Sequence, residues 1–104
     1  MSKAPVRFGL VGFGAWGRFH AQSIAGNPGA RLAAITVPSE SSRNEAARLY
    51  PGAAIYTDHR AMLAAGGLDI VDVVTPSHTH LAVATDAMEA GCDVLLEKPM
   101  ALTI

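Results

Sequence analysis

Hydrophobic positions along this chain follow two kinds of pattern. Short, nearly continuous apolar runs are typical of strands that are buried on both faces. Between them lie segments whose apolar residues recur every three or four positions, as on one face of a helix. The apolar runs predict strands at 6–12, 30–36, 53–57, 69–75 and 93–99. The periodic segments predict helices at 15–26, 39–50, 58–66 and 79–91.

Strands and helices thus alternate along the whole chain, with short connections between them. This alternation indicates right-handed βαβ units, in which parallel strands form one sheet with helices on both faces. The expected fold is α/β, with a doubly wound parallel sheet of about five strands in the order 3-2-1-4-5.

Several local signals support these boundaries. Asp58 is a suitable N-cap for the third helix. Gly26 is expected to end the first helix, and Gly91 lies just beyond the end of the fourth. The pair at 51–52, Pro-Gly, stops the second helix.

Composition narrows the function classes. With 104 residues the chain is one domain at most, and half of its residues are hydrophobic. Its net charge is −1 with 16% charged residues, which does not resemble a nucleic-acid or membrane-surface binder. The single cysteine, Cys92, excludes an internal disulfide and a multi-cysteine metal site and suits a reducing cytoplasm. The start of the sequence resembles neither a signal peptide nor a membrane span.

Three glycines stand where the first strand is expected to become the first helix. Gly12, Gly14 and Gly17 form the pattern G-x-G-x-x-G in a βαβ unit, the context that makes this motif informative. The first glycine allows the tight turn, the second the approach of a pyrophosphate, and the third close packing of helix on strand. The amides of residues 14–17 (Gly14, Ala15, Trp16 and Gly17) would bind the phosphates of a dinucleotide in a Rossmann-like fold. The alternative is a glycine-rich turn without a ligand.

The end of the second strand bears on which dinucleotide is bound. An acidic residue there would hydrogen-bond the ribose 2′-hydroxyl of NAD, but Val37 stands in its place. Ser39 and Arg43 follow and suit the 2′-phosphate of NADP. The pattern slightly favours NADP and leaves NAD open, with Arg43 as a solvated helix residue as the alternative.

Three stretches together carry a resemblance to a known family. They are GFGAWGRFHA at 12–21, VVTPSHTH at 73–80 and AGCDVLLEKPMALT at 90–103. In this order they resemble the N-terminal domain of the glucose–fructose oxidoreductase, inositol dehydrogenase and MocA family. The resemblance covers essentially the entire chain and implies that residues 1–104 are a dinucleotide-binding domain of an NAD(P)-dependent oxidoreductase.

The resemblance also implies roles for individual residues. Lys98 of the E-K-P motif would lie beside the nicotinamide and the substrate, where a cationic donor stabilises a developing alkoxide during hydride transfer. Glu97 would position Lys98 or a loop amide, a purely structural role being the alternative, and the bond before Pro99 is expected to be cis. Thr75 and Pro76 would line the cofactor.

Other residues near these motifs have mainly structural interpretations. His80 is expected to hold its loop by hydrogen bonds, within the cofactor-binding set, and His20 to be a packing residue. His78 and His80 are two positions apart, the wrong spacing for a metal site on one helical face, so no metal is expected. Phe13 and Trp16 would shield the phosphate turn or belong to the core.

The family continues past E-K-P into a helix, a sixth strand and a second domain that supplies the substrate pocket. We therefore expect a domain truncated before its last strand, with the catalytic domain absent and no turnover by this chain alone. The substrate class stays open among sugars, polyols and pyrrole-type compounds.

Three interpretations remain at this stage: the cofactor half of an oxidoreductase, a non-enzymatic nucleotide-binding or regulatory module, or a structural protein with an empty glycine loop. Titration with NADH and NADPH tests the first, an intact short gene without a second domain would favour the second, and an occluded glycine turn would support the third. The edge of the fifth strand, with its apolar VLLE, also predicts a homo-oligomer, a dimer by edge pairing.

Overall fold

The computed structural model describes residues 4–75 and 77–96. Strands and helices alternate throughout this part of the chain, as the sequence predicts. They are β1 (Val6–Val11), α1 (Ala15–Ala25), β2 (Ala30–Thr36), α2 (Glu40–Leu49), β3 (Ala54–Tyr56), α3 (His59–Ala65), β4 (Ile70–Val73), α4 (Ser77–Glu89) and β5 (Asp93–Leu96).

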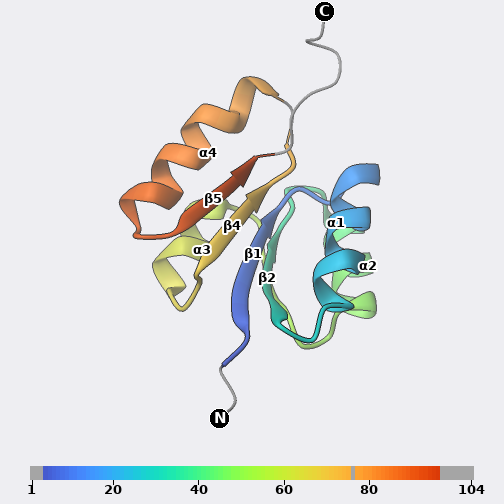
Figure 1. The fold of residues 1–104 in the computed structure, drawn as a ribbon. Helices are drawn as coiled ribbons and strands as arrows, with labels where there is room; N and C mark the ends of the chain where they lie inside the picture. Colours follow the sequence, from blue (N-terminus) through green and yellow to red (C-terminus); the bar gives the residue numbers. More distant parts are fainter. Residues whose placement is uncertain (1–3, 76, 97–104) are drawn as a thin grey trace, which may run out of the picture.

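The strands form a single parallel sheet in the order β3-β2-β1-β4-β5, which confirms the predicted fold class and strand order. Helices α1 and α2 cover one face of this sheet, and α3 and α4 cover the other (Figure 1). The chain crosses the sheet between β3 and β4, so the order of the strands reverses between β1 and β4. In open α/β sheets such a reversal leaves a crevice at the carboxyl ends of the strands, where ligands bind.

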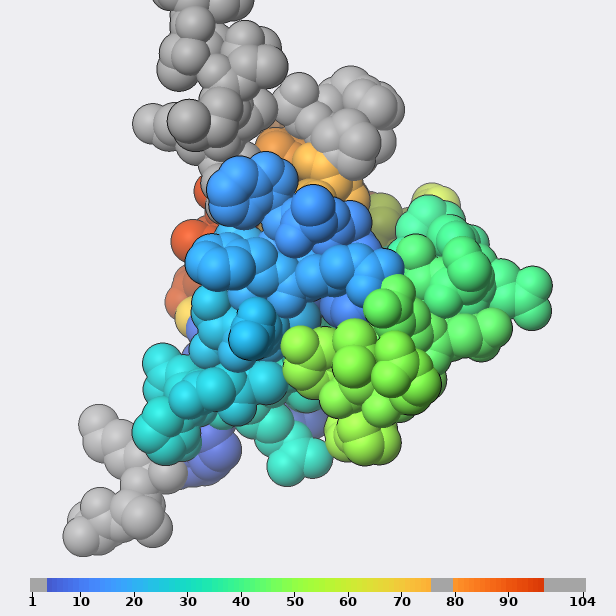
Figure 2. Space-filling model, turned by 90° about the vertical axis from the view of Figure 1, so that its right-hand side faces the viewer, coloured from blue at the N-terminus to red at the C-terminus, as the bar shows by residue number. Residues whose placement is uncertain are grey.

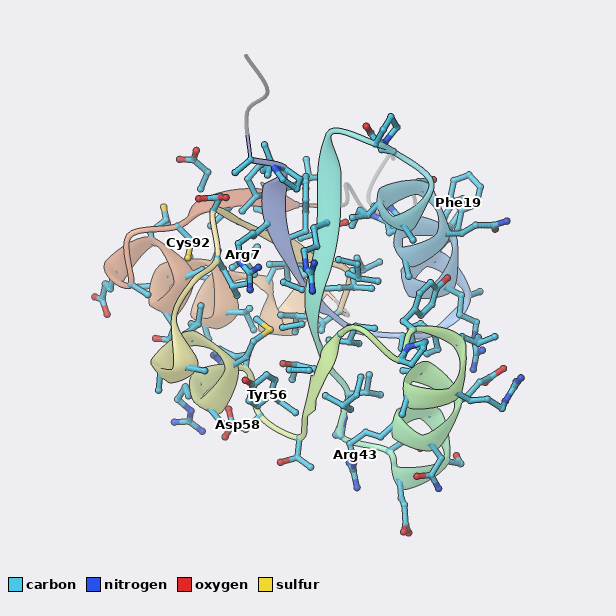
Figure 3. The ribbon with its side chains drawn as sticks, turned by 90° about the horizontal axis from the view of Figure 1, so that it is seen from below. Arg7, Phe19, Arg43, Tyr56, Asp58 and Cys92 are labelled. Carbon is cyan, nitrogen blue, oxygen red and sulfur yellow. The ribbon has the colours of Figure 1, made fainter. Side chains whose placement is uncertain are left out.

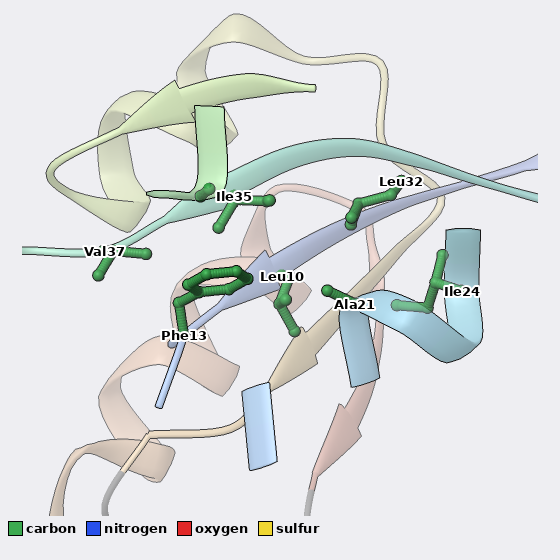
Figure 4. Close-up of a cluster of buried hydrophobic side chains, with 8 residues drawn as sticks. Leu10, Phe13, Ala21, Ile24, Leu32, Ile35 and Val37 are labelled. Atoms are coloured by element: carbon green, nitrogen blue, oxygen red, sulfur yellow. The ribbon is translucent and has the colours of Figure 1, made fainter. Parts of the chain in front are cut away.

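Each face of the sheet has its own hydrophobic core. Alternate side chains of one strand point to opposite faces, so Leu10 of β1 packs under α1 and Val11 packs under α3 and α4. Figure 4 shows the α1 side, where Leu10 and Ile35 of the sheet pack in one hydrophobic cluster with Ala21 and Ile24 of α1. These contacts fix α1 along β1, and with it the turn that joins them.

The observed boundaries are close to the predicted ones. Gly26 is the C-cap of α1, and the Asp58 carboxylate caps α3 by accepting from the backbone N–H of Arg60 at 2.8 Å. Helix α4 begins at Ser77, two residues before the predicted start at 79. Strand β5 is described as far as Leu96, and the remaining residues of the predicted strand lie outside the described part of the chain.

Strand β5 lies at one edge of the sheet, and the side chains of Leu95 and Leu96 are about half exposed. These are the features on which the expected edge-to-edge dimer depends, and the dimer itself stays a prediction. Within residues 4–75 and 77–96, no helix combines the length and the apolar character needed to cross a membrane.

Candidate functional site

The turn between β1 and α1 is built so tightly that two of its positions require glycine. Gly12 has a φ of +110°, and a Cβ there would lie 2.8 Å from the carbonyl oxygen of Val74 in the neighbouring β4–α4 connection. A Cβ on Gly17 would overlap the carbonyl oxygen of Gly12. The first glycine therefore makes the turn, and the third lets α1 approach β1 closely, as the sequence predicts.

Gly14 is different, because no neighbour requires it to be glycine. It is the N-cap of α1 with φ −76° and ψ −159°, and a Cβ there would meet nothing within 4 Å. The helix ladder begins with the N–H of Arg18, which donates to the carbonyl oxygen of Gly14 at 2.9 Å. The amides of Ala15, Trp16 and Gly17 precede that first bond, and no side chain of the N-cap accepts from them. Open space in front of amides at the positive end of a helix dipole suits an anion.

A cleft with a volume of about 450 Å³ opens beside this turn. It lies where the strand order reverses, at the carboxyl ends of β1, β2 and β4. Its lining comes from these strand ends and from α3 and α4, and comprises Val11, Gly12, Thr36, Pro38, Thr57, Asp58, His59, Arg60, Thr75, Ala82 and Val83.

The end of β2 forms one rim of the cleft. The side chain of Val37 is buried in the α1-side core, so no side chain at that position is presented to a ligand. Ser39 caps α2 and lies 3.1 Å, oxygen to oxygen, from the hydroxyl of Ser41. Arg43 donates through Nη1 to the carbonyl oxygens of Val37 at 3.0 Å and Pro38 at 2.5 Å. The guanidinium is thus held against the rim rather than extended into solvent.

The junction between β3 and α3 forms the opposite rim. Arg60 donates to the Asp58 carboxylate through its backbone N–H and, at 3.3 Å, through its guanidinium. These bonds, the backbone one first, hold the pKa of Asp58 below its usual value. Asp58 and Arg43 therefore belong to opposite rims of the cleft. Figure 3 shows them on either side of β3.

The start of α1 carries one further cation. Arg18 donates to the carboxylate of Glu45 on α2 at 2.5 Å and stacks on the ring of Phe13, 4.7 Å from its centroid. The hydrogen bond to Glu45 raises the pKa of Arg18, and the same bond lowers the pKa of Glu45. Arg18 therefore joins α1 to α2, two helices whose surfaces lie side by side in Figure 2.

Two histidines hold elements around the site. The ring Nε2 of His80, at the start of α4, donates to the carbonyl oxygen of Thr75, which is the loop-holding role predicted for it. His20 was expected to be a packing residue, but its Nδ1 lies 2.6 Å from Oδ2 of Asp72. Asp72 is in the middle of β4 and only 1% exposed, so its carboxylate needs such a partner. The sequence signal that could have revealed this pair is the acid at position 72, which has apolar residues on both sides in the predicted strand.

The structure brings together only part of the predicted site. Gly12 and Thr75 line the cleft, and Ala15 lies at the open end of α1. Phe13 is a core residue, whereas Trp16 is exposed and packs edge-on against Phe19, which points away from the sheet (Figure 3). Four residues with predicted roles lie outside the described residues: Pro76, Glu97, Lys98 and Pro99.

The sequence model of the family described as "Oxidoreductase family, NAD-binding Rossmann fold" (GFO_IDH_MocA) matches residues 6–104. Inositol 2-dehydrogenase 1 of Saccharopolyspora erythraea is 38% identical over 100 residues, which are 94% of this chain and 30% of that protein.

Two solved structures are similar to this fold over most of the chain. Scyllo-inositol dehydrogenase of Lactobacillus casei with bound NAD(H) and scyllo-inositol has a TM-score of 0.86 at 31% identity, over 91% of this chain and 28% of that one. Biliverdin reductase of a Synechocystis species, in complex with biliverdin and NADP+, has a TM-score of 0.85 at 31% identity, over 96% and 31%. The chain thus spans about 30% of the length of the relatives it matches.

Substituting Gly17 and Gly14 tests whether the turn requires glycine at one position and not at the other. Gly17→Ala is expected to lower the free energy of unfolding by about 1–3 kcal/mol, because the new Cβ overlaps a backbone oxygen that cannot move aside. Gly14→Ser is expected to raise it by about 0.3 kcal/mol, because a serine in this extended N-cap accepts from the first amides of α1. Urea unfolding followed by circular dichroism measures both.

Gly52→Ser is the matched control for this pair. Gly52 is exposed, a Cβ there meets nothing within 4 Å, and its replacement should change the free energy of unfolding by less than about 0.5 kcal/mol. A Gly17→Ala variant as stable as the parent would contradict the close approach of α1 to β1.

Proposed function

Because this chain belongs to the oxidoreductase family with an NAD-binding Rossmann fold, we propose that its glycine turn holds the diphosphate of NAD or NADP for a dehydrogenase. The observation that carries the proposal is the contrast among the glycines. Gly12 and Gly17 are required by their neighbours, whereas Gly14 faces open space in front of the first amides of α1. A glycine that the fold does not require is expected where a ligand needs the room.

The direction of the bound dinucleotide follows from the sheet. In this fold the ribose next to adenine lies at the end of the second strand, so the adenosine half would extend toward Thr36, Pro38 and Ser39. The nicotinamide half would then extend the other way, past Thr75 toward the carboxyl end of β5. The turn at Gly12 lies between the two halves, where a diphosphate belongs.

The chemistry of the proposed reaction is hydride transfer, which the nicotinamide ring supplies when it is bound. Lys98 follows β5 by two positions in the sequence, and we propose that it acts near the nicotinamide. Its role would be to donate a hydrogen bond to the oxygen of a carbonyl or alcohol and to stabilise negative charge there. Glu97 would orient the lysine.

We propose a sugar or polyol as the substrate, since relatives of this chain are named as inositol and glucoside dehydrogenases. A pyrrole-type substrate is the alternative, on the likeness to biliverdin reductase. The 104 residues are proposed to bind the dinucleotide without completing the reaction, because the relatives are more than three times as long.

Binding to the Gly14 variant tests this function. Gly14→Ser is expected to weaken binding of NADH and NADPH by about tenfold or more, because its hydroxymethyl group occupies the place of the diphosphate and competes for the same amides. Quenching of tryptophan fluorescence or calorimetric titration provides the dissociation constants, with Gly52→Ser as the control expected to bind like the parent. If the parent chain bound neither dinucleotide at millimolar concentration, the proposed function would be wrong.

The preference between cofactors is proposed to favour NADP slightly. Arg43 is held at the rim by two carbonyl oxygens that use only its Nη1, and Ser39 lies beside it at the start of α2. Both are suited to the 2′-phosphate.

Arg43→Ala is therefore expected to weaken binding of NADPH about tenfold relative to NADH, as loss of a hydrogen bond between charged groups does. Arg48→Ala, which removes an exposed arginine from the same helix, is the control and should leave the NADPH to NADH ratio within about twofold. Equal losses for both dinucleotides with Arg43→Ala would show that Arg43 only holds the β2–α2 connection.

A further inference from the structure

His59 and Asp86 form a contact that the sequence pattern does not suggest. His59 is the first residue of α3, and Asp86 lies in α4, 27 residues later. The imidazole Nε2 donates to Oδ2 of Asp86 at 2.7 Å. The His59 side chain is 17% exposed and that of Asp86 is 36% exposed, so solvent weakens this bond less than it would on an open surface.

This pair joins the two walls of the 450 Å³ cleft. One wall is the β3–α3 junction, which contributes Thr57 to Arg60. The other wall includes Ala82 and Val83 of α4, and Asp86 lies one helical turn further along the same helix. The His59–Asp86 bond therefore links α3, which contributes to one wall, to α4, which contributes to the other.

Helix α3 is held by one contact in its middle and by another in its first turn. It has seven residues and is thus too short to be stable without contacts to its neighbours. Met62, in its middle, is buried in the core, and its sulfur accepts a hydrogen bond from the hydroxyl of Thr36 at 3.3 Å. The bond from His59 to Asp86 fixes the first turn, which is the turn that borders the cleft.

We infer that His59, held by Asp86, is a positioning residue that sets the width of the adenosine end of the cleft. The inference rests on the proposed function, in which the dinucleotide places its adenosine half between the end of β2 and the start of α3. Removing the bond lets the first turn of α3 move away from α4, which loosens the contacts to adenosine. The glycine turn follows β1, which β2 separates from β3 in the sheet, and it keeps its own geometry.

ADP and inorganic pyrophosphate both carry a diphosphate, but only ADP carries adenosine. Comparing their binding therefore distinguishes a role of His59 at the adenosine end from a general loss of structure. ADP fills the adenosine end and the glycine turn, whereas inorganic pyrophosphate fills the glycine turn alone. His59→Met keeps much of the side-chain volume but removes the donor, and is expected to weaken ADP binding about five- to tenfold. The same variant should change pyrophosphate binding by less than about twofold. His59→Gln, whose amide N–H can reach Asp86, should restore ADP binding to within about twofold of the parent.

Asp86→Ala removes the acceptor from the more exposed side and is expected to reproduce the effect of His59→Met, with no further loss in the double variant. Leu81→Ala, at an exposed position of α4, controls for changes to that helix and should bind both ligands like the parent. Calorimetric titration gives the constants, and urea unfolding confirms that each variant is folded.

The remaining outcomes contradict either the inference about His59 or the proposed function. If the parent binds ADP and folded His59→Met binds it equally well, the inference is wrong while the proposed function stands. If ADP and pyrophosphate binding were weakened equally, the His59–Asp86 pair would be a general support of the fold and the inference would be overturned. The inference would also be overturned if neither single variant folded. A parent that binds neither ADP nor pyrophosphate nor a dinucleotide removes the proposed function itself.

Discussion

The close approach of α1 to β1 is the constraint on which the rest of this structure depends. A carbonyl oxygen of Gly12 occupies the space where any side chain on Gly17 would begin, so the helix starts directly at the end of the central strand. Packing of Leu10 against Ala21 and Ile24 holds the helix there. The consequence is that the first amides of α1 face the crevice made by the reversal of strand order, with the positive end of the helix dipole behind them.

Other elements are tied to this centre by single polar bonds of three histidines. His20 of α1 pairs with the buried Asp72 of β4, His80 of α4 holds the carbonyl of Thr75, and His59 joins α3 to α4. The three bonds lie on both faces of the sheet, and they connect helices to one another, to a strand or to the loop that follows a strand. Hydrophobic packing orders the layers, whereas these directional bonds fix the elements that border the cleft.

The fold could be predicted from the sequence because its signals are local. Continuous apolar runs, the capping Asp58 and the terminating Gly26 act within a few residues, and the βαβ rule supplies the strand order. The glycine turn was predictable for the same reason. The bond of His80 to its loop was predictable because it is local. The bonds between distant residues were not, since His20 and Asp72 are 52 positions apart and only the folded sheet brings them together. Likewise, nothing local shows that Val37 points into the core or that Arg43 is bound by the carbonyls of its own rim. Side-chain direction at strand ends depends on packing that residue type does not determine.

In the proposed function, the amides at the start of α1 hold a diphosphate. The decisive experiment records the amide nitrogen–proton NMR spectrum of the chain while NADP+ is added. We expect the largest shifts at the amides of residues 12–17, and these shifts should saturate together with those around the cleft. Binding that leaves these amides unshifted while others move, or no change at millimolar NADP+ and NAD+, would contradict this proposal.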